Sequence, residues 1–395
     1  MEKHQLNATL HLIENPGAIL GDLPLPAIQA VKLVVRTRWQ RPNGIPGPAI
    51  ANVLRGALGL TLRKLVCPEG WHDHPCAPCP LYRECTYGQV FMPTPPDDST
   101  QLRLQQDLPR PFVIEPPGMH PDERVTPEGL TFRLMLFGTA IQQLPYFIST
   151  LDRLGFEGMG RDRVPFQVER ITAEHPQGDE LLFTEGANSI SLPKKSITTQ
   201  DLMAQLYPVE ILAARNMDVR NRVLARMGRE PIPRAESVTA IDPTKPRLKL
   251  SFLTPLLLKS GSGIDADGKR IPAQEIRERP AMGVIIRRLR DRLSSLCTFF
   301  GERWDCPDFA AWGTLADQVH VIDSRTTWLT RQRRSTRTGH AHEVSGLVGQ
   351  TTYEFPDEQT FQTLTPLLRI GELIHVGKNA PWGNGGMRGS VMVRN

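Results

Sequence analysis

No stretch of this sequence approaches the roughly 18 to 20 consecutive apolar residues that a membrane-spanning helix needs. Residues 1–16 also lack the apolar core of a secretory signal peptide. We therefore expect a protein of the cytoplasm with no membrane partner. Structural disulfides are rare in that compartment, so the six cysteines of the chain need another explanation.

The excess of positive over negative side chains is also small. The net charge is only +5, so a role with nucleic acid must come from local clusters of arginine. The sequence has three such clusters, and each taken alone has an alternative interpretation as a solvated helix face. Together with two glycine-rich loops they favour a polyanionic partner. The clusters are Arg220, Arg222, Arg226 and Arg229; Arg287, Arg288, Arg290 and Arg292; and Arg331, Arg333, Arg334 and Arg337.

Glycine is concentrated in two loops that each follow an apolar, helix-like run. The denser loop spans residues 377–386, and residues 155–161 partly repeat its pattern. Glycines spaced this closely let a backbone approach a ligand with its N–H groups exposed. Basic residues flank both loops, so the pattern predicts contact with a polyanion. The predicted contacts are Arg161, Arg163, Gly377, Lys378, Gly383, Gly385, Gly386 and Arg388.

Hydrophobic patterns predict an α+β unit in the first half of the chain. Runs of β-branched or alternating residues predict strands, and apolar residues at a period near 3.6 predict helices. Their order, with a weaker strand near Phe112, is typical of a ferredoxin-like fold. The expected strands are 28–38, 130–137 and 166–171, and the expected helices are 50–66 and 141–154.

The same pattern restarts in the second half, with strands at 249–257, 318–328, 344–355 and 390–394 and helices at 280–299 and 363–374. We therefore predict tandem ferredoxin-like domains of the α+β class, as divergent copies of one fold. The predicted boundaries are 1–27 for an N-terminal extension, 28–175 and 245–395 for the two domains, and 176–244 for a linker or inserted segment.

Four cysteines lie in a proline-rich insertion at residues 67–96, spaced Cys-x8-Cys-x2-Cys-x5-Cys. A Cys-x2-Cys pair chelates one ion through a tight turn, and two further thiolates complete a tetrahedron. We expect a structural metal at Cys67, Cys76, Cys79 and Cys85, with His72 or His74 able to replace one ligand. Zinc is favoured over an iron–sulfur cluster, although sulfur ligands alone do not decide between them. The alternatives are four free thiols or a redox pair at Cys76 and Cys79.

Several short motifs occur together in a fixed order along the chain. They are Gly47-x6-Leu-Arg-Gly-Ala-Leu-Gly59, Cys79-Pro-Leu-Tyr-x2-Cys85, Gly155-x2-Gly-x-Gly-Arg161 followed by Phe166, Phe252-x-Thr-Pro255, Arg334-x2-Arg-Thr-Gly339, Ser345-Gly346 and the closing Gly377–Gly386. By these motifs the chain resembles the CRISPR repeat endoribonucleases, a branch of the CRISPR-associated RAMP proteins that processes precursor CRISPR RNA. The resemblance covers residues 28–175 and 245–395.

The resemblance implies two ferredoxin-like (RAMP/RRM-like) domains side by side, with the C-terminal glycine-rich loop against the RNA. It also implies metal-independent cleavage of a repeat, in which the RNA's own 2′-hydroxyl attacks the adjacent phosphate. Such a reaction needs a base, an acid for the leaving oxygen and a cation beside the phosphorane. No cofactor is therefore expected for catalysis.

Histidine is missing where the resemblance leads us to expect it. Many members of the family carry the working histidine near the first helix, whereas residues 37–66 contain none. The best remaining pair is His340 and His342, directly after the third arginine cluster. We predict catalysis by His340, His342 and Arg337, with RNA binding by Arg331, Arg333 and Arg334. The alternative is an exposed loop whose histidines have no catalytic role, and His375 is expected to be a packed core residue.

The leading hypothesis is an endoribonuclease that binds CRISPR repeat RNA and cleaves precursor CRISPR RNA into mature CRISPR RNA. The missing histidine favours a second hypothesis, a non-catalytic RAMP subunit that holds the end of a CRISPR RNA among other CRISPR-associated proteins of an effector complex. A third, a metal-stabilised protein-interaction module, leaves the two glycine-rich loops unexplained.

Overall fold

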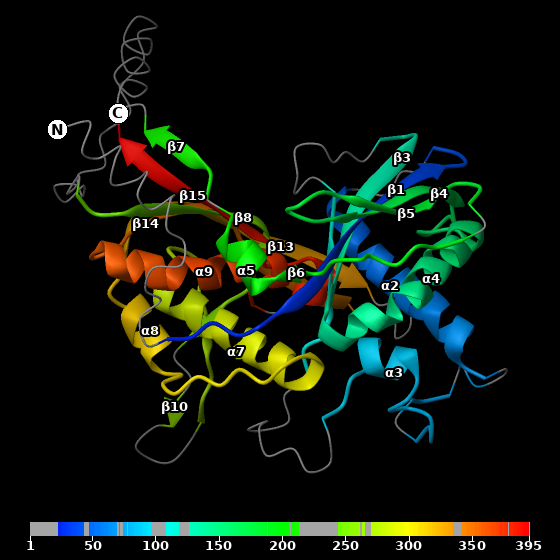
Figure 1. The fold of residues 1–395 in the computed structure, drawn as a ribbon, viewed down its shortest axis with the longest axis horizontal. Coiled ribbons are helices and arrows are strands. Elements are labelled where there is room, and N and C mark those ends of the chain that lie inside the picture. The colour runs from blue at the N-terminus through cyan, green and yellow to red at the C-terminus, as the bar shows by residue number, and fades with distance from the viewer. Residues whose placement is uncertain are drawn as a thin grey trace, which may run out of the picture.

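The fold is mixed α/β, with two main sheets that are largely antiparallel (Figure 1). It is described from a computed structural model. The residues described are 23–42, 47–68, 71, 74–76, 78–95, 108–117, 126–187, 189–205, 207–212, 244–260, 263–264, 270–334, 341–377 and 379–394.

The N-terminal sheet has the strand order β2-β3-β1-β4-β5, and β6 pairs with the start of β1. Alternate residues of β1, such as Val31, Leu33 and Val35, pack in one core with helices α2 and α4. The strands are β1 (Gln29–Trp39), β2 (Phe112–Glu115), β3 (Gly129–Phe137), β4 (Phe166–Glu174), β5 (Glu180–Thr184) and β6 (Ile197–Thr198). The helices of this half are α2 (Gly47–Val66), α3 (Thr86–Phe91), η1 (Gly138–Gln143), α4 (Leu144–Glu157) and α5 (Thr199–Met203).

The C-terminal sheet has the order β13-β14-β8-β15-β7, in which only the β15–β7 pair is parallel. Its strands are β7 (Val209–Leu212), β8 (Arg247–Leu256), β13 (His320–Arg334), β14 (Ala341–Glu354) and β15 (Met387–Arg394). Two short ribbons pair β9 (Lys259–Ser260) with β12 (Gln274–Glu275) and β10 (Gly263–Ile264) with β11 (Arg270–Ile271). The helices are α7 (Met282–Phe300), α8 (Ala311–Ala316), α9 (Glu358–Ile374) and η2 (Ala380–Trp382).

The two halves repeat one connection order. The first half runs β1-α2-β2-β3-α4-β4 and the second runs β8-α7-β13-β14-α9-β15, apart from short added elements. The matching strands also take matching places, β2-β3-β1-β4 in one sheet and β13-β14-β8-β15 in the other. The strands and helices expected from the sequence are confirmed, with ends that shift by a few residues.

The segment expected to be a linker at 176–244 is more ordered than predicted in its first part. It adds β5 and β6 to the N-terminal sheet, then α5, and then β7 to the C-terminal sheet. Residues 213–243, which include the arginine cluster that begins at Arg220, lie outside the described residues. The segment that connects the two halves therefore contributes strands to both sheets.

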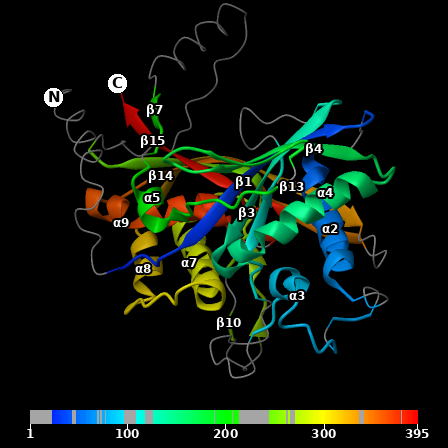
Figure 2. The same cartoon turned by 45° about the vertical axis from the view of Figure 1, so that its right-hand side comes forward.

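The two halves share a hydrophobic core. Ala30, Val113 and Met135 of the N-terminal sheet are buried in the same cluster as Leu367 and Ile370 of α9. Figure 2 shows α9 below strands β14 and β15 of the C-terminal sheet, with α7 and α8 below it in turn. Since apolar contact of this kind is the main stabilising force in folding, the two halves stabilise each other. In the described parts of the chain no helix is long and apolar enough to cross a membrane.

Candidate nucleic-acid interface

The glycine-rich loop folds back onto the N-terminal half. It leaves α9 at His375, forms the short helix η2, and enters β15 at Met387. Gly383 (φ +76°) and Gly385 (φ +71°) adopt backbone angles that only glycine takes without strain. A Cβ atom at Gly383 would also collide with the carbonyl oxygen of Ile114 in β2. The glycines therefore permit close packing of the loop against the other half.

The amide groups of this loop are bonded to the protein itself. Gly385 N–H donates to the carbonyl oxygen of Pro255 (3.0 Å), and Gly386 N–H donates to Thr254 Oγ1 (2.8 Å). Gly383 N–H donates to the carbonyl oxygen of Ala380 (2.9 Å). The glycine spacing predicts amides that face a polyanion, whereas in this conformation each of the three has a protein acceptor. The Phe252-x-Thr-Pro255 motif instead receives the loop. Contact of the loop with RNA stays a prediction.

Helix α2 presents a cation to the loop. The Arg55 guanidinium lies over the Trp382 ring of η2, 4.8 Å from the ring centroid. Leu54 and Leu58, on the buried side of the same helix, hold it against the sheet. An arginine over an aromatic face gains a cation–π attraction and still keeps N–H groups to donate. The sequence signals only that Arg55 lies outside the apolar stripe of the helix and gives no indication of its pairing with Trp382.

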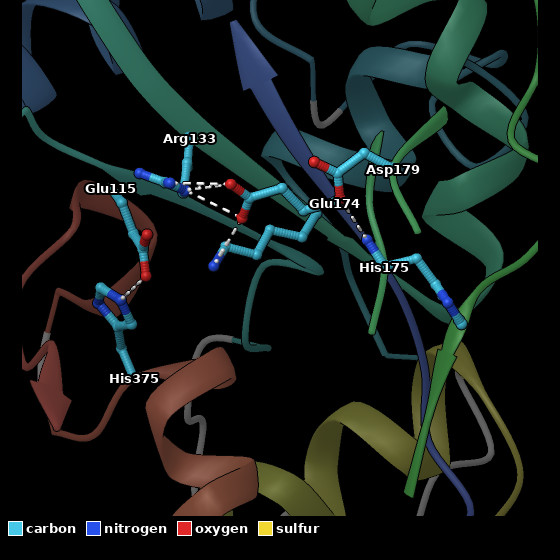
Figure 3. Close-up of polar contacts among 7 residues, drawn as sticks. Glu115, Arg133, Glu174, His175, Asp179 and His375 are labelled. Carbon is cyan, nitrogen blue, oxygen red and sulfur yellow. Dashed lines mark hydrogen bonds and ion pairs between the residues drawn. The ribbon is translucent and has the colours of Figure 1, made fainter. Parts of the chain in front are cut away.

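His375 joins the loop to the N-terminal half. Its side chain is fully buried, as expected of a core residue, and Glu115 of β2 is 4% exposed. His375 Nδ1 lies 3.1 Å from the carbonyl oxygen of Asn384, and Nε2 lies 3.2 Å from Glu115 Oε1. Figure 3 shows this contact beside a second polar cluster of the N-terminal sheet. One imidazole ring therefore closes the loop and also fastens it to β2.

The second polar cluster centres on Glu174 at the end of β4. Its carboxylate accepts from Arg133 (2.8 Å), as Figure 3 shows, and it also pairs with Lys32 (3.0 Å). Burial alone would raise the pKa of Glu174, but the Arg133 hydrogen bond and the Lys32 charge lower it to about 2. A pocket of about 320 Å³ lies beside this cluster, between the two halves. Charges of both signs line it, from Lys32, Glu115, Glu174, Arg369, Glu372 and Arg388.

Strands β13 and β14 form a long ribbon that carries part of the predicted catalytic segment. Its register pairs Arg331 with Val344, Arg333 with His342 and Arg334 with Ala341. The backbone therefore brings Arg333 and His342 to directly opposite positions. Arg337, His340 and Lys378 lie outside the described residues, and their predicted roles stay predictions.

Two family models match this chain. Residues 29–195 match one described only as an N-terminal domain. The model described as CRISPR-associated endoribonuclease Cas6 matches residues 250–387. This range includes the glycine-rich loop and ends at the first residue of β15. The second half of the chain is therefore a domain of the CRISPR repeat endoribonuclease family.

Solved structures named Cas6 are similar to this chain at low sequence identity. A Cas6 product complex is 13% identical, with a TM-score of 0.47 over 91% of this chain and 99% of that chain. Thermus thermophilus Cas6 is 12% identical, with a TM-score of 0.44 over 92% and 100%. A partial Cas6-RT-Cas1–Cas2 complex is 11% identical, with a TM-score of 0.49 over 94% of this chain and 47% of that chain. No curated protein matches the chain.

The four arginines of α7 have structural partners. Each hydrogen-bonds another segment, while the side chains of Arg287 and Arg288 stay 39% and 43% exposed, so the cluster is a partly solvated helix face. Burial lowers the pKa of Arg292 to about 10, and this residue closes the C-terminal end of α9. The pairs are Arg287 with Asp317 (2.8 Å), Arg288 with the carbonyl oxygen of Lys259 (2.8 Å), Arg290 with that of Phe309 (2.6 Å) and Arg292 with that of Ile374 (2.9 Å).

The second glycine-rich loop, residues 155–161, ends the N-terminal counterpart of the unit that residues 377–386 end in the C-terminal half. It follows α4, and a bridge between Met159 and Val164 tightens it. A Cβ atom at Gly158 would collide with the carbonyl oxygen of Arg163, so this glycine again permits close backbone packing. Arg161 and Arg163 are exposed at the tip of this loop, where a ligand can reach them.

The four clustered cysteines form no disulfide in the structure and are partly buried. Burial raises the pKa of the Cys67 and Cys76 thiols, and the neighbouring thiols Cys79 and Cys85 raise both further, while Arg63 opposes the change. The thiols are therefore close enough to influence one another. Within the described ranges, no three histidine, cysteine or acidic side chains already form a group that could hold a metal ion.

Proposed function

We propose that this protein binds CRISPR repeat RNA and cleaves precursor CRISPR RNA by attack of a 2′-hydroxyl on the adjacent phosphate, without a catalytic metal. The observation that carries this proposal is the Cas6 match of residues 250–387, which contain both the ribbon and the glycine-rich loop. The loop docks on α2 and β2, so the RNA site would lie where the two halves meet.

The fold proposal is a pair of ferredoxin-like domains at 28–175 and 245–395, with the extension at 1–27 and the segment 176–244 outside them. It is supported by the repeated β-α-β-β-α-β order and by the matching strand places in the two sheets. With no membrane-spanning helix among the described elements, the proposed location is the cytoplasm, together with the RNA and other CRISPR-associated proteins.

Two histidines and one arginine are proposed to perform the chemistry. His340 and His342 would serve as acid and base, since imidazole titrates near neutral pH. Arg337 would stabilise the negative charge of the phosphorane. The proposed RNA contacts are Arg331, Arg333, Arg334, Lys378, Arg388, Arg161, Arg163 and the backbone of Gly377, Gly383, Gly385 and Gly386. The amides of the last three are bonded to protein, so RNA would reach this backbone through other atoms.

Cleavage is tested with candidate CRISPR repeat RNA. The protein should cut this RNA in EDTA and leave a 2′,3′-cyclic phosphate, because the 2′-hydroxyl is the nucleophile. His340→Ala with His342→Ala should slow single-turnover cleavage by ~10²–10⁴ and leave binding unchanged. His320→Ala, in the base of the same ribbon, is the matched control. A double variant that cleaves at the wild-type rate would place the acid and base elsewhere.

The second candidate function is a non-catalytic RAMP subunit that holds a CRISPR RNA end. The absence of histidine from residues 37–66 favours it. In that case the wild-type protein would bind repeat RNA with the same salt dependence and produce no cleavage product in the assay above.

We also infer that Cys67, Cys76, Cys79 and Cys85 hold a structural metal, with zinc favoured over an iron–sulfur cluster. The soft thiolate donors fit such an ion, and the thiols already influence one another's pKa. Binding would draw the proline-rich insertion together and contribute folding free energy. Elemental analysis of protein purified anaerobically without chelators should find one equivalent of metal, lost in Cys79→Ser and kept in Cys306→Ser. Metal-free wild-type protein would overturn the inference.

A further inference from the structure

His375 sits in a backbone conformation that its residue type disfavours. It ends α9 with φ +60° and ψ 163°, a region occupied almost only by glycine. The loop that follows has glycine at Gly377, Gly383 and Gly385, each with positive φ, yet this position holds a histidine. Strain of this kind persists only where the surrounding contacts hold the residue in place. The side chain of His375 supplies those contacts.

Both ring nitrogens of His375 are hydrogen-bonded to oxygen. The carbonyl oxygen of Asn384 can only accept, so Nδ1 carries a hydrogen and donates it across the loop (3.1 Å). The remaining nitrogen, Nε2, faces Glu115 Oε1 at 3.2 Å. If the carboxylate is ionised, Nε2 must also carry a hydrogen. If Nε2 is bare, the carboxyl must carry it. In either form the couple holds one proton more than a neutral imidazole and an ionised carboxylate.

We propose that this shared proton fastens the glycine-rich loop to β2, which makes His375 and Glu115 positioning residues for the loop and gives its docking a pH dependence. Loss of the proton leaves a nitrogen lone pair facing a carboxylate oxygen, and the contact turns from attractive to repulsive. The loop then loses this link to β2 and keeps the contact of Trp382 with Arg55 of α2. The consequence for RNA rests on the function proposed above, whereas the link itself does not.

The charged groups around the couple decide which atom carries the proton. Arg133 of β3 is the ladder partner of Glu115, and it is 3% exposed. Arg292 of α7 donates to the carbonyl oxygen of Ile374, the residue before His375. Farther out lie Lys32 and Glu174 of β1 and β4, Arg55 of α2, Arg369 and Glu372 of α9, and Arg388 of β15. Arg133, the ladder partner of Glu115, favours the ionised carboxylate, and on that ground we assign the shared proton to the imidazole.

The decisive variant is Glu115→Gln, because an amide N–H can donate to the Nε2 lone pair of a neutral imidazole. This variant keeps a hydrogen bond between residues 115 and 375 and does not need the shared proton to form it. In the wild-type protein without RNA, hydrogen exchange of the peptide 376–390, corrected for the intrinsic rate, should accelerate at least threefold between pH 6 and pH 9. In Glu115→Gln it should stay constant, and in Glu115→Ala it should be fast at both pH values. Equal pH dependence in the wild type and Glu115→Gln would overturn the proposal.

A second measurement needs no variant. In ¹⁵N-histidine spectra of the wild type, the buried His375 ring should show both nitrogens protonated wherever the loop is protected, with exposed His320 as the internal reference. A neutral His375 ring under those conditions, beside an ionised Glu115 carboxylate, would also overturn the proposal.

An RNA arm separates this proposal from the proposed function. Affinity for the repeat RNA, measured in the His340→Ala, His342→Ala background so that the RNA stays intact and no site histidine titrates, should fall at least threefold from pH 6 to pH 9 with Glu115 present and stay constant with Glu115→Gln. If the exchange results hold but the wild type binds no repeat RNA at any pH, the proposed function fails and the link stands. If RNA binds and Glu115→Gln keeps the wild-type pH dependence of both affinity and exchange, the link fails and the function stands.

Discussion

Replacing Glu174 with glutamine should make the stability of this protein less sensitive to acid. The pKa of Glu174 in the folded protein is about 2, against 4.5 for the free group, because Arg133 and Lys32 favour the ionised form. Since a change of one in the pKa corresponds to about 1.4 kcal/mol, the ionised carboxylate contributes about 3 kcal/mol to the free energy of unfolding. A lowered pKa means that this contribution is present above about 4.5 and is lost as the pH falls through about 2.

The measurement is urea unfolding of the wild type and Glu174→Gln at pH 7 and pH 3.5. Over this interval Glu174 alone should lower the wild-type free energy of unfolding by about 1.4 kcal/mol. The variant should lack this component and be less stable than the wild type at pH 7 by about 2 to 3 kcal/mol. The difference between the two proteins should therefore shrink as the pH falls.

The matched control is Glu169→Gln on the same strand. Glu169 pairs with Arg38 at 3.5 Å, and both side chains are well exposed, so the pair contributes little. If Glu174→Gln lost as much stability between pH 7 and pH 3.5 as the wild type and Glu169→Gln, the assignment of the low pKa to the Arg133 and Lys32 contacts would be refuted.

Three other changes test the loop and the core. Gly385→Ala should lower the free energy of unfolding by about 2 kcal/mol or more, because the added Cβ collides with Val376 and the positive φ disfavours alanine; thermal unfolding measures this, and an unchanged midpoint would show that the loop packs differently. Thr254→Val should remove the acceptor of Gly386 N–H and destabilise by about 1–3 kcal/mol, with a matching rise in hydrogen exchange at residue 386. Burial raises the pKa of Cys297 to about 12, so iodoacetamide at pH 8 should leave this thiol unmodified in the folded protein and label it after unfolding.

The main elements could be predicted from the sequence because hydrophobic periodicity is a local property. The apolar repeat from Ile50 to Val66 is the buried side of α2, and the run 280–299 is α7 within two residues. The second unit was recognised for the same reason, since its pattern repeats that of the first. The C-terminal end of β13 is less predictable from the sequence. The strand continues to Arg334 through polar residues, and backbone pairing with β14 extends it there without the apolar alternation that marks a buried strand.

The contacts that define the candidate site could not be predicted, because their partners are remote in the chain. His375 was expected to be buried, yet Glu115 lies 260 residues before it. The glycine spacing predicts amides that face a ligand, whereas the amides of Gly385 and Gly386 donate hydrogen bonds to Pro255 and Thr254. The sequence contains the Phe252-x-Thr-Pro255 motif and the glycine motif separately, and nothing local indicates that one accepts hydrogen bonds from the other.

The position of β15 has a consequence for the order of assembly during synthesis. β15 lies between β8 and β7, both of which the ribosome makes more than 100 residues earlier. Until Met387–Arg394 is made, β8 lacks a neighbour on that side and β7 lacks its parallel partner. Contacts this distant in sequence form slowly, and an unpaired strand edge is prone to join other chains. A nascent chain that stalls before residue 387 would therefore expose an open sheet edge, which makes this interval the one in which a chaperone is most useful.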